Sequence, residues 1–175
     1  MSKKTLLFLS FFGVLTLFGA LCAPTFAADE KDPFKSTPYP VPRFVSLGSG
    51  EVFVRTGPGR KYPVKWTLKK KTLPVEIILE YENWRKIKDY EGATGWVHSS
   101  LISGRRTGLI IMEDGAAPLR SKAKPDGRLI ALLEAGSLIH LENCDGTWCR
   151  IRISGYKGYT KQQNIWGAYE NEVFD

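Results

Sequence analysis

Trp84-Arg85-Lys86-Ile87 recurs in similar form later in this chain, as Trp148-Cys149-Arg150-Ile151. Two flanking pieces repeat at nearly the same spacing. Val54-Arg55-Thr56 returns as Leu119-Arg120-Ser121 at a spacing one position longer, and Gly95-Trp96 returns as Gly158-Tyr159 at a spacing one position shorter. Such a small drift in each direction is what hairpin turns of unequal length produce. The sequence therefore predicts two modules, residues 43–104 and 108–167, each of about 60 residues and large enough to fold.

Short strands separated by turns dominate both modules. Apolar or alternating runs cover residues 51–55, 75–79, 84–88 and 95–97, and Gly57-Pro58-Gly59 is typical of a tight turn. Sustained helical periodicity is missing from residue 28 onward. The expected fold class is all-β, with two small barrels in tandem.

The segment 1–27 has the parts of a secretory signal. Lys3 and Lys4 precede an apolar run over residues 6–22, and the small residues around Ala27 fit a cleavage site. The alternative is an uncleaved anchor, because the run is close to the lower limit for spanning a bilayer. We expect cleavage, export and no stable membrane span afterwards. Four prolines make residues 28–42 an extended leader, which either packs on the first module or stays free. At the other end of the chain, residues 168–175 are expected to form a tail.

The chain resembles exported tandem bacterial SH3 proteins of the alphaproteobacterial type. The resemblance rests on three stretches of the first module and their weaker copies in the second, and on Trp166-Gly167-Ala168-Tyr169 at the end. The three stretches are Arg55-Thr56-Gly57-Pro58-Gly59, Trp84–Ile87 and Gly95–Leu101. The resemblance covers about residues 42–170 and implies two five-stranded SH3-like barrels. It also implies a periplasmic location, with secretion as the alternative. Lys122-Ala123 replaces Gly-Pro in the second copy, which puts a ligand groove there in doubt. Many proteins with such modules have cell-wall or peptide-binding roles.

Two cysteines remain after the signal, Cys144 and Cys149, and they flank an Asp-Gly turn. Strands that close such a turn bring facing side chains to disulfide distance, and an exported chain meets an oxidising compartment. A structural bridge is the favoured interpretation. A reactive or metal-binding thiol pair is the alternative, but the spacing and the two histidines, His98 and His140, complete no zinc pattern. We expect neither a metal nor another cofactor.

Strand alternation predicts which side chains face outward. In the second module Cys149, Ile151 and Ile153 share one face, the core face, while Trp148, Arg150 and Arg152 share the other. In the first module Trp84, Lys86 and Lys88 lie together in the same way, opposite Ile87. An aromatic ring beside cations suits a ligand with carboxylates or phosphates. The competing interpretation is that each tryptophan covers a barrel edge under the stems of its neighbours.

Further candidates extend this surface. Tyr62 and Trp66 lie in the expected long first loop, where they either enlarge the aromatic groove or pin the loop to the barrel. Trp96 precedes the better core residue Val97 and is expected to be partly exposed. Arg55 and Arg120 recur at one position, and we expect each to pair with a carboxylate inside its own module.

Catalysis is not predicted, because the chain lacks the motifs of nucleophile, metalloprotease and phosphate-binding sites. The carboxylate pairs Glu80/Glu82 and Asp89/Glu91 lie by hairpin turns and are expected to be solvated. Cleavage after Ala27 removes Lys3 and Lys4 and leaves a modest charge of +5 (25 − 2 − 18), and an exported protein seldom meets nucleic acid, which is therefore not an expected partner. The first hypothesis is a monomeric envelope module that binds peptidoglycan or its stem peptides. The alternatives are an adaptor for an extended or Pro-rich segment of an envelope protein, and a structural module whose leader carries the interaction.

Overall fold

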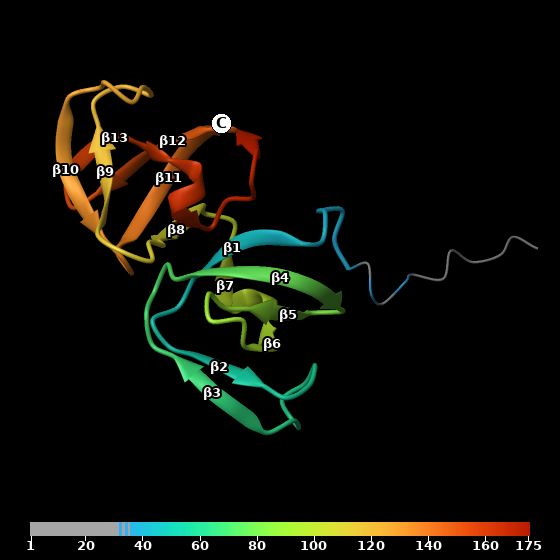
Figure 1. Ribbon diagram of the computed structural model, residues 1–175. Coiled ribbons are helices and arrows are strands. Elements are labelled where there is room, and N and C mark those ends of the chain that lie inside the picture. The colour runs from blue at the N-terminus through green and yellow to red at the C-terminus, as the bar shows by residue number, and fades with distance from the viewer. Residues whose placement is uncertain (1–31, 33, 35) are drawn as a thin grey trace, which may run out of the picture. The chain divides into compact units, whose positions relative to one another are not determined.

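The computed structural model describes residues 32, 34 and 36–175, so the expected signal segment lies outside the described residues. Residues 31–175 form one compact unit. Within it are two separate antiparallel sheets, the first blue to green and the second mostly yellow to red in Figure 1. The all-β class with two small barrels is confirmed.

The first barrel is the sheet formed by β1 to β7, with strand order β3-β2-β6-β5-β4-β1-β7. A single 3-10 turn, Ser99–Leu101, precedes its last strand. The strands are β1 (Arg43–Leu47), β2 (Val52–Arg55), β3 (Val64–Leu68), β4 (Pro74–Tyr81), β5 (Trp84–Lys88), β6 (Thr94–His98) and β7 (Ile102–Ser103).

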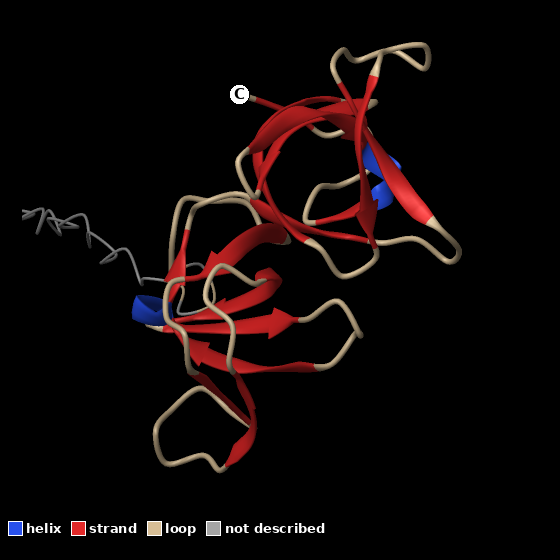
Figure 2. Cartoon of the chain, turned by 90° about the vertical axis from the view of Figure 1, so that its left-hand side faces the viewer, coloured by secondary structure: helices blue, strands red, loops and turns tan. Residues whose placement is uncertain are grey.

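The second barrel is the sheet formed by β8 to β15 and repeats this order as β10-β9-β13-β12-β11-β8-β14, with β15 added beside β11. Its strands curve round into a ring in Figure 2. A 3-10 turn, Gln162–Asn164, matches the one in the first barrel. The strands are β8 (Thr107–Ile110), β9 (Ala116–Arg120), β10 (Leu129–Glu134), β11 (Leu138–Asp145), β12 (Trp148–Ile153), β13 (Tyr156–Lys161), β14 (Ile165–Trp166) and β15 (Val173–Phe174).

Each barrel has its own apolar core, built by strand alternation. Val52 and Val54 of β2 are fully buried in the first core, and Leu119 of β9 and Ile151 of β12 are fully buried in the second. Full burial of one such side chain contributes about 1.5–3 kcal/mol. The expected core face of β12 is confirmed for Cys149 and Ile151, and Ile153 packs against the same core while partly exposed.

The strand count differs from the five per barrel that the resemblance implied. Two-residue strands, β7 and β14, close each sheet, and the tail contributes β15, where Phe174 pairs with Cys144. The segment after the Gly-Pro-Gly turn was expected to be loop throughout. It becomes β3 from Val64 onward, because its alternating Val, Trp and Leu suit a strand edge and it pairs with β2.

A buried ion cluster links the two strands of the β4–β5 hairpin beside its turn. Glu80 is 1% exposed, receives a short hydrogen bond from Arg43 and lies 3.2 Å from Nε of Arg85. The Thr37 hydroxyl of the leader lies 2.9 Å from both carboxylate oxygens, so residue 37 packs on the first barrel. Burial opposes ionisation of Glu80, but the hydrogen bonds from Arg43 and Thr37 and the charge of Arg85 keep its pKa below the usual value. The expectation that Glu80 and Asp89 are solvated is wrong, because both are buried and hydrogen-bonded.

The equivalent position in the second barrel carries the disulfide. Cys144 and Cys149 are cross-strand partners in the β11–β12 hairpin and are joined. Gly146 has a φ of +92° in the turn between them, a conformation that favours glycine. The Asp145 carboxylate accepts hydrogen bonds from the backbone N–H groups of Thr147 and Trp148. The predicted bridge and its Asp-Gly turn are therefore both present.

The closing Trp166–Tyr169 segment contacts the first barrel. The Phe44 ring lies 5.0 Å from the Trp166 ring and 4.7 Å from the Tyr169 ring. The Tyr169 hydroxyl donates to Glu76 at 2.9 Å, and burial together with this carboxylate raises the pKa of Tyr169. Lys88 lies over Trp166 and pairs with Glu76. The Trp166–Tyr169 segment therefore packs between the two barrels.

Candidate functional site

The outer face of the first barrel is built from alternate residues of three neighbouring strands. Trp84 of β5 pairs with His98 of β6, and Lys86 pairs with Trp96. Arg55 of β2 pairs with Trp96 from the other side. The opposite face of these strands is the apolar core, so the outer face gathers aromatic and basic side chains.

A groove of about 190 Å³ lies on this face. Trp84 is half-buried in its wall, edge-on to the His98 ring at 5.4 Å between centroids. Phe53 is 47% exposed and adds a second aromatic surface. The lining residues are Phe53, Arg55, Arg60, Trp84, His98, Ser100 and Leu101. The groove therefore combines aromatic area with two arginines, and none of these lining residues is a carboxylate.

Arg55 shapes the loop that forms one end of the groove. Its Nη1 donates to the carbonyl oxygens of Arg60 at 3.2 Å and Tyr62 at 2.8 Å. Arg120 donates in the same way to the Gly127 carbonyl at 2.9 Å. The expectation that Arg55 and Arg120 pair with carboxylates is wrong, because backbone carbonyl groups of the loops accept their hydrogen bonds. The structural role itself is present, and among the described residues no acid forms an ion pair with Arg55.

His98 has a defined orientation in the groove wall. Its Nδ1 accepts from the backbone N–H of Ser100 at 3.3 Å and lies 2.8 Å from the Ser100 hydroxyl. In the neutral ring the proton is then on Nε2. No hydrogen bond engages Nε2 within residues 36–175, so the ring offers a donor beside Trp84.

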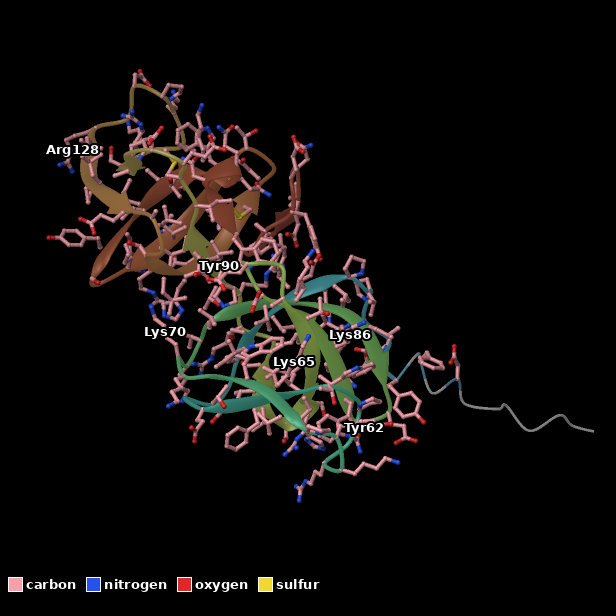
Figure 3. All side chains as sticks on the ribbon, turned by 60° about the horizontal axis from the view of Figure 1, so that its bottom comes forward. Tyr62, Lys65, Lys70, Lys86, Tyr90 and Arg128 are labelled. Atoms are coloured by element: carbon pink, nitrogen blue, oxygen red, sulfur yellow. A yellow bond between two sulfur atoms is a disulfide. The ribbon has the colours of Figure 1, made fainter. Side chains whose placement is uncertain are left out.

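Lys86 provides a further cation next to the groove, on β5 (labelled in Figure 3). In the described part of the chain Lys86 takes part in no ion pair. Lys88, two residues further along the strand, is engaged by Glu76 and Trp166. Arg60 is exposed at the groove rim, and its side chain likewise has no acidic partner among the described residues.

Tyr62 and Trp66 do not line the groove. The Tyr62 ring packs on the loop at Gly57, where an added Cβ would lie 2.5 Å from the ring, so Tyr62 pins the loop. Trp66 packs against the first core, and Lys65 lies over its ring at 5.2 Å (Tyr62 and Lys65 are labelled in Figure 3). Between the two interpretations of these residues, the geometry supports loop pinning for Tyr62 and core packing for Trp66.

Trp96 is only 9% exposed, so the expectation of partial exposure is wrong. Its neighbours on both sides are strands, since β6 is central between β2 and β5. The long side chains of Lys86 and Arg55 are its cross-strand neighbours on this face. Trp96 therefore serves as the floor of the outer face.

The second barrel lacks the same arrangement. Trp148 is 8% exposed, so the prediction that its indole faces water is wrong. Arg150 and Arg152, predicted ligand cations, both pair with Glu142, at 3.2 and 3.7 Å, and Lys157 joins them at 3.4 Å. Glu142 is the extra residue of a β-bulge in β11. Its carboxylate partly neutralises the cations that would otherwise attract an anion.

Five groove residues were missed from sequence: Phe53, Arg60, His98, Ser100 and Leu101. Two of them had a readable signal. Phe53 lies between the core residues Val52 and Val54, and His98 has the parity of Trp96, so alternation places both on the outer face. Arg60 and Ser100 lie in a loop and a 3-10 turn, where alternation gives no information.

Comparison with known families decides what kind of barrel this is. A family model described as bacterial SH3 domain matches residues 48–104 and 113–167. The chain belongs to the bacterial SH3 domain family. Each match falls within one barrel, so the tandem bacterial SH3 domains coincide with the sequence repeat and with the two sheets.

Two solved structures from Trichomonas vaginalis are similar to these bacterial SH3 domains. NlpC2 is 18% identical over 73% of this chain and 49% of its own, with a TM-score of 0.33. NlpC1 is 18% identical over 75% of this chain and 48% of its own, with the same TM-score. The chain thus spans about half the length of either protein. A search of curated proteins finds no match.

No helix in the described part of the chain is both long and apolar enough to cross a bilayer. Nor do residues 36–175 contain a group of three or more His, Cys, Asp or Glu side chains that could hold a metal ion.

Proposed function

We propose that this protein is a non-catalytic binding module of the cell envelope. Its ligand is peptidoglycan, bound through the stem peptides by the groove of the first barrel. One observation carries the proposal. The groove joins an aromatic wall, Trp84 and Phe53, to arginines that no carboxylate of the lining neutralises.

The chemistry of the groove fits a short peptide with carboxylates. Arg60 and Lys86 offer charge-assisted hydrogen bonds to a carboxylate, and Nε2 of His98 offers a donor to a peptide carbonyl. The rings of Trp84 and Phe53 give contact area to an aliphatic stem. A peptide strand is extended and matches an open groove better than a compact small molecule does.

The disulfide supports an oxidising compartment and a binding role rather than catalysis. Bridges of this kind persist in exported proteins. Both described cysteines are joined, so neither supplies a thiolate nucleophile. We propose that the protein is exported, acts in the periplasm and binds as a monomer.

Sedimentation with purified, protein-free peptidoglycan tests this function. The wild-type protein is expected to sediment with the polymer at low salt and to be released as salt rises. Trp84→Ala should lower the bound fraction about tenfold, in line with the loss of an aromatic anchor. Arg60→Glu, at an exposed position of the groove rim, should lower it at least as much by reversing a charge.

Tyr156→Ala is the matched control, because Tyr156 is an exposed aromatic residue of the second barrel. Its bound fraction should equal that of the wild type. The proposal fails if the wild-type protein stays in the supernatant at low salt, or if Trp84→Ala and Arg60→Glu both sediment as the wild type does.

A further inference from the structure

A second, larger cleft of about 840 Å³ lies away from the groove. It is lined by three segments of the second barrel and by Tyr90 from the β5–β6 turn of the first (labelled in Figure 3). The three segments are the β8 end with the following loop, residues 109–114, the β10–β11 turn, residues 135–136, and the 3-10 turn residues 163–164. None of these residues lines the groove.

Apolar side chains reach solvent inside this cleft. Ile111 is 43% exposed, Tyr90 is 53% exposed, and Met112 is partly exposed beside them. An aliphatic side chain, a thioether and an aromatic ring line this one cleft, and apolar side chains gathered in this way mark a candidate contact surface for a partner. Methionine adapts its shape to different ligands and is frequent at peptide-binding surfaces.

The charge of the cleft is opposite to that of the whole chain. The two charged lining residues are Glu113 and Asp114, both exposed, in a protein with a net charge of +7. A third carboxylate, Glu91, accepts a hydrogen bond from the Tyr90 hydroxyl at 2.8 Å. The hydrogen bond to this carboxylate and its charge raise the pKa of Tyr90.

Hydrogen-bonding groups complete the cleft. Gln163 is exposed and Asn164 partly exposed, and in the described residues neither side-chain amide has a hydrogen-bond partner. Such amides donate to and accept from the backbone of an extended chain. The backbone of Asn164 is already used, because its carbonyl accepts from the N–H of Ile111.

We propose that this cleft docks an extended segment of a partner protein in which an apolar side chain is flanked by Lys or Arg. The apolar side chain inserts between Ile111, Met112 and Tyr90, and the flanking cations face Glu113 and Asp114. Peptidoglycan stem peptides do not fit, since their carboxylates would meet these two acids. The groove and the cleft therefore select ligands of opposite charge, and the protein can link an envelope polymer to a basic protein segment.

Met112 is a built-in probe of the cleft, because the chain has two methionines and the other is Met1. The experiment labels methionine methyl groups with carbon-13 in the full-length protein and follows the Met112 signal by NMR. The probe is the blocked peptide Gly-Lys-Lys-Phe-Leu-Lys-Lys-Gly. A matched peptide with Glu in place of every Lys keeps the apolar pair and reverses the charge. The Met112 signal is expected to shift and saturate with the lysine peptide only.

Two variants test the roles of charge and of apolar contact. Glu113→Lys with Asp114→Lys should weaken binding of the lysine peptide at least threefold, and Ile111→Ser should weaken it similarly. The matched control is Glu51→Lys with Asp126→Lys, which makes the same charge change at exposed sites outside the cleft. The control should bind as the wild type does.

Each other outcome overturns the proposal. A Met112 signal that moves with neither peptide, or equally with both, excludes a basic partner. Equal weakening by the control variant shows a general charge effect and excludes docking at the cleft. Trp84→Ala should leave the titration unchanged, so the result is independent of whether the groove binds peptidoglycan.

Discussion

The two barrels solve the same structural problem with different chemistry. Beside the turn of the β4–β5 hairpin, Glu80 faces Arg85 across the strands, and at the same place in β11–β12, Cys144 faces Cys149. The two pairs occupy equivalent positions of the sequence repeat. One copy links the two strands of its hairpin by an ion pair and the other by a covalent bond, so the scaffold accommodates two different kinds of cross-strand link at this position.

The outer faces differ in a related way. Both long strands carry a β-bulge at the same place, and the extra residue is Ile78 in β4 and Glu142 in β11. Glu142 gathers Arg150, Arg152 and Lys157, whereas Ile78 offers no charge to Lys86. A single position in the repeat thus separates a surface with open cations from one with paired cations.

The largest expected effect comes from breaking the ion pair. Glu80→Ala leaves Arg85 buried without its acid, and loss of one partner of a buried pair costs about 3–5 kcal/mol. Urea denaturation followed by circular dichroism should show this fall in the free energy of unfolding. Glu82→Ala, at an exposed neighbour, is the control and should change it little. An equal loss in both variants would show that the cluster is not responsible.

Acid should weaken both barrels. The folded-state pKa values of Glu80 and Glu172 are lowered, the latter because hydrogen bonds from Arg106 and from the Tyr169 N–H outweigh burial. The unfolded chain then binds more protons, so this stability is complete above about pH 5 and is lost as the pH falls through the folded pKa values. Urea midpoints measured from pH 7 to pH 3 test this. Glu80→Gln with Glu172→Gln should flatten the dependence, and an unchanged slope would contradict it.

Removing the disulfide should cost less than breaking the ion pair. Cys144→Ser with Cys149→Ser releases a short loop, and the chain-entropy model gives about 2 kcal/mol. The urea midpoint measures the effect. If this double variant were destabilised more than Glu80→Ala, the proposed ranking of the two links would be reversed.

Exchanging the bulge residues should give the smallest changes and tests the outer faces directly. Ile78→Glu places an acid near Lys86 and should lower the peptidoglycan-bound fraction of the protein by about threefold to tenfold. Glu142→Ile releases Arg150, Arg152 and Lys157 from their acid and should raise the peptidoglycan-bound fraction. Because these are exposed ion pairs, the variant should lower the free energy of unfolding by less than about 1 kcal/mol. Ile78→Gln is the neutral control. Equal binding by all three variants would mean that the cations do not contact the ligand.

Strand alternation and the repeat predicted the architecture because both depend on local periodicity. Two barrels, the Cys144–Cys149 bridge and the core face of β12 follow from spacing alone. Ion pairing across a bulge does not follow, because the extra residue shifts the parity by one, and this hid the partnership of Glu142 with Arg150. The burial of Trp148 was missed because side-chain alternation distinguishes two faces of a strand but does not indicate what covers the outer one.

The Glu80–Arg85 link has a consequence for how the molecule matures. The barrel that carries the groove contains no sulfur in its hairpin, so its closure depends on no oxidant. Under reducing conditions that hairpin would still form its cross-strand link, whereas the hairpin of the second barrel would lack its covalent bond and the stability of about 2 kcal/mol that the bond contributes. Redox conditions therefore change the stability of the second barrel and leave the link beside the groove of the first barrel unchanged.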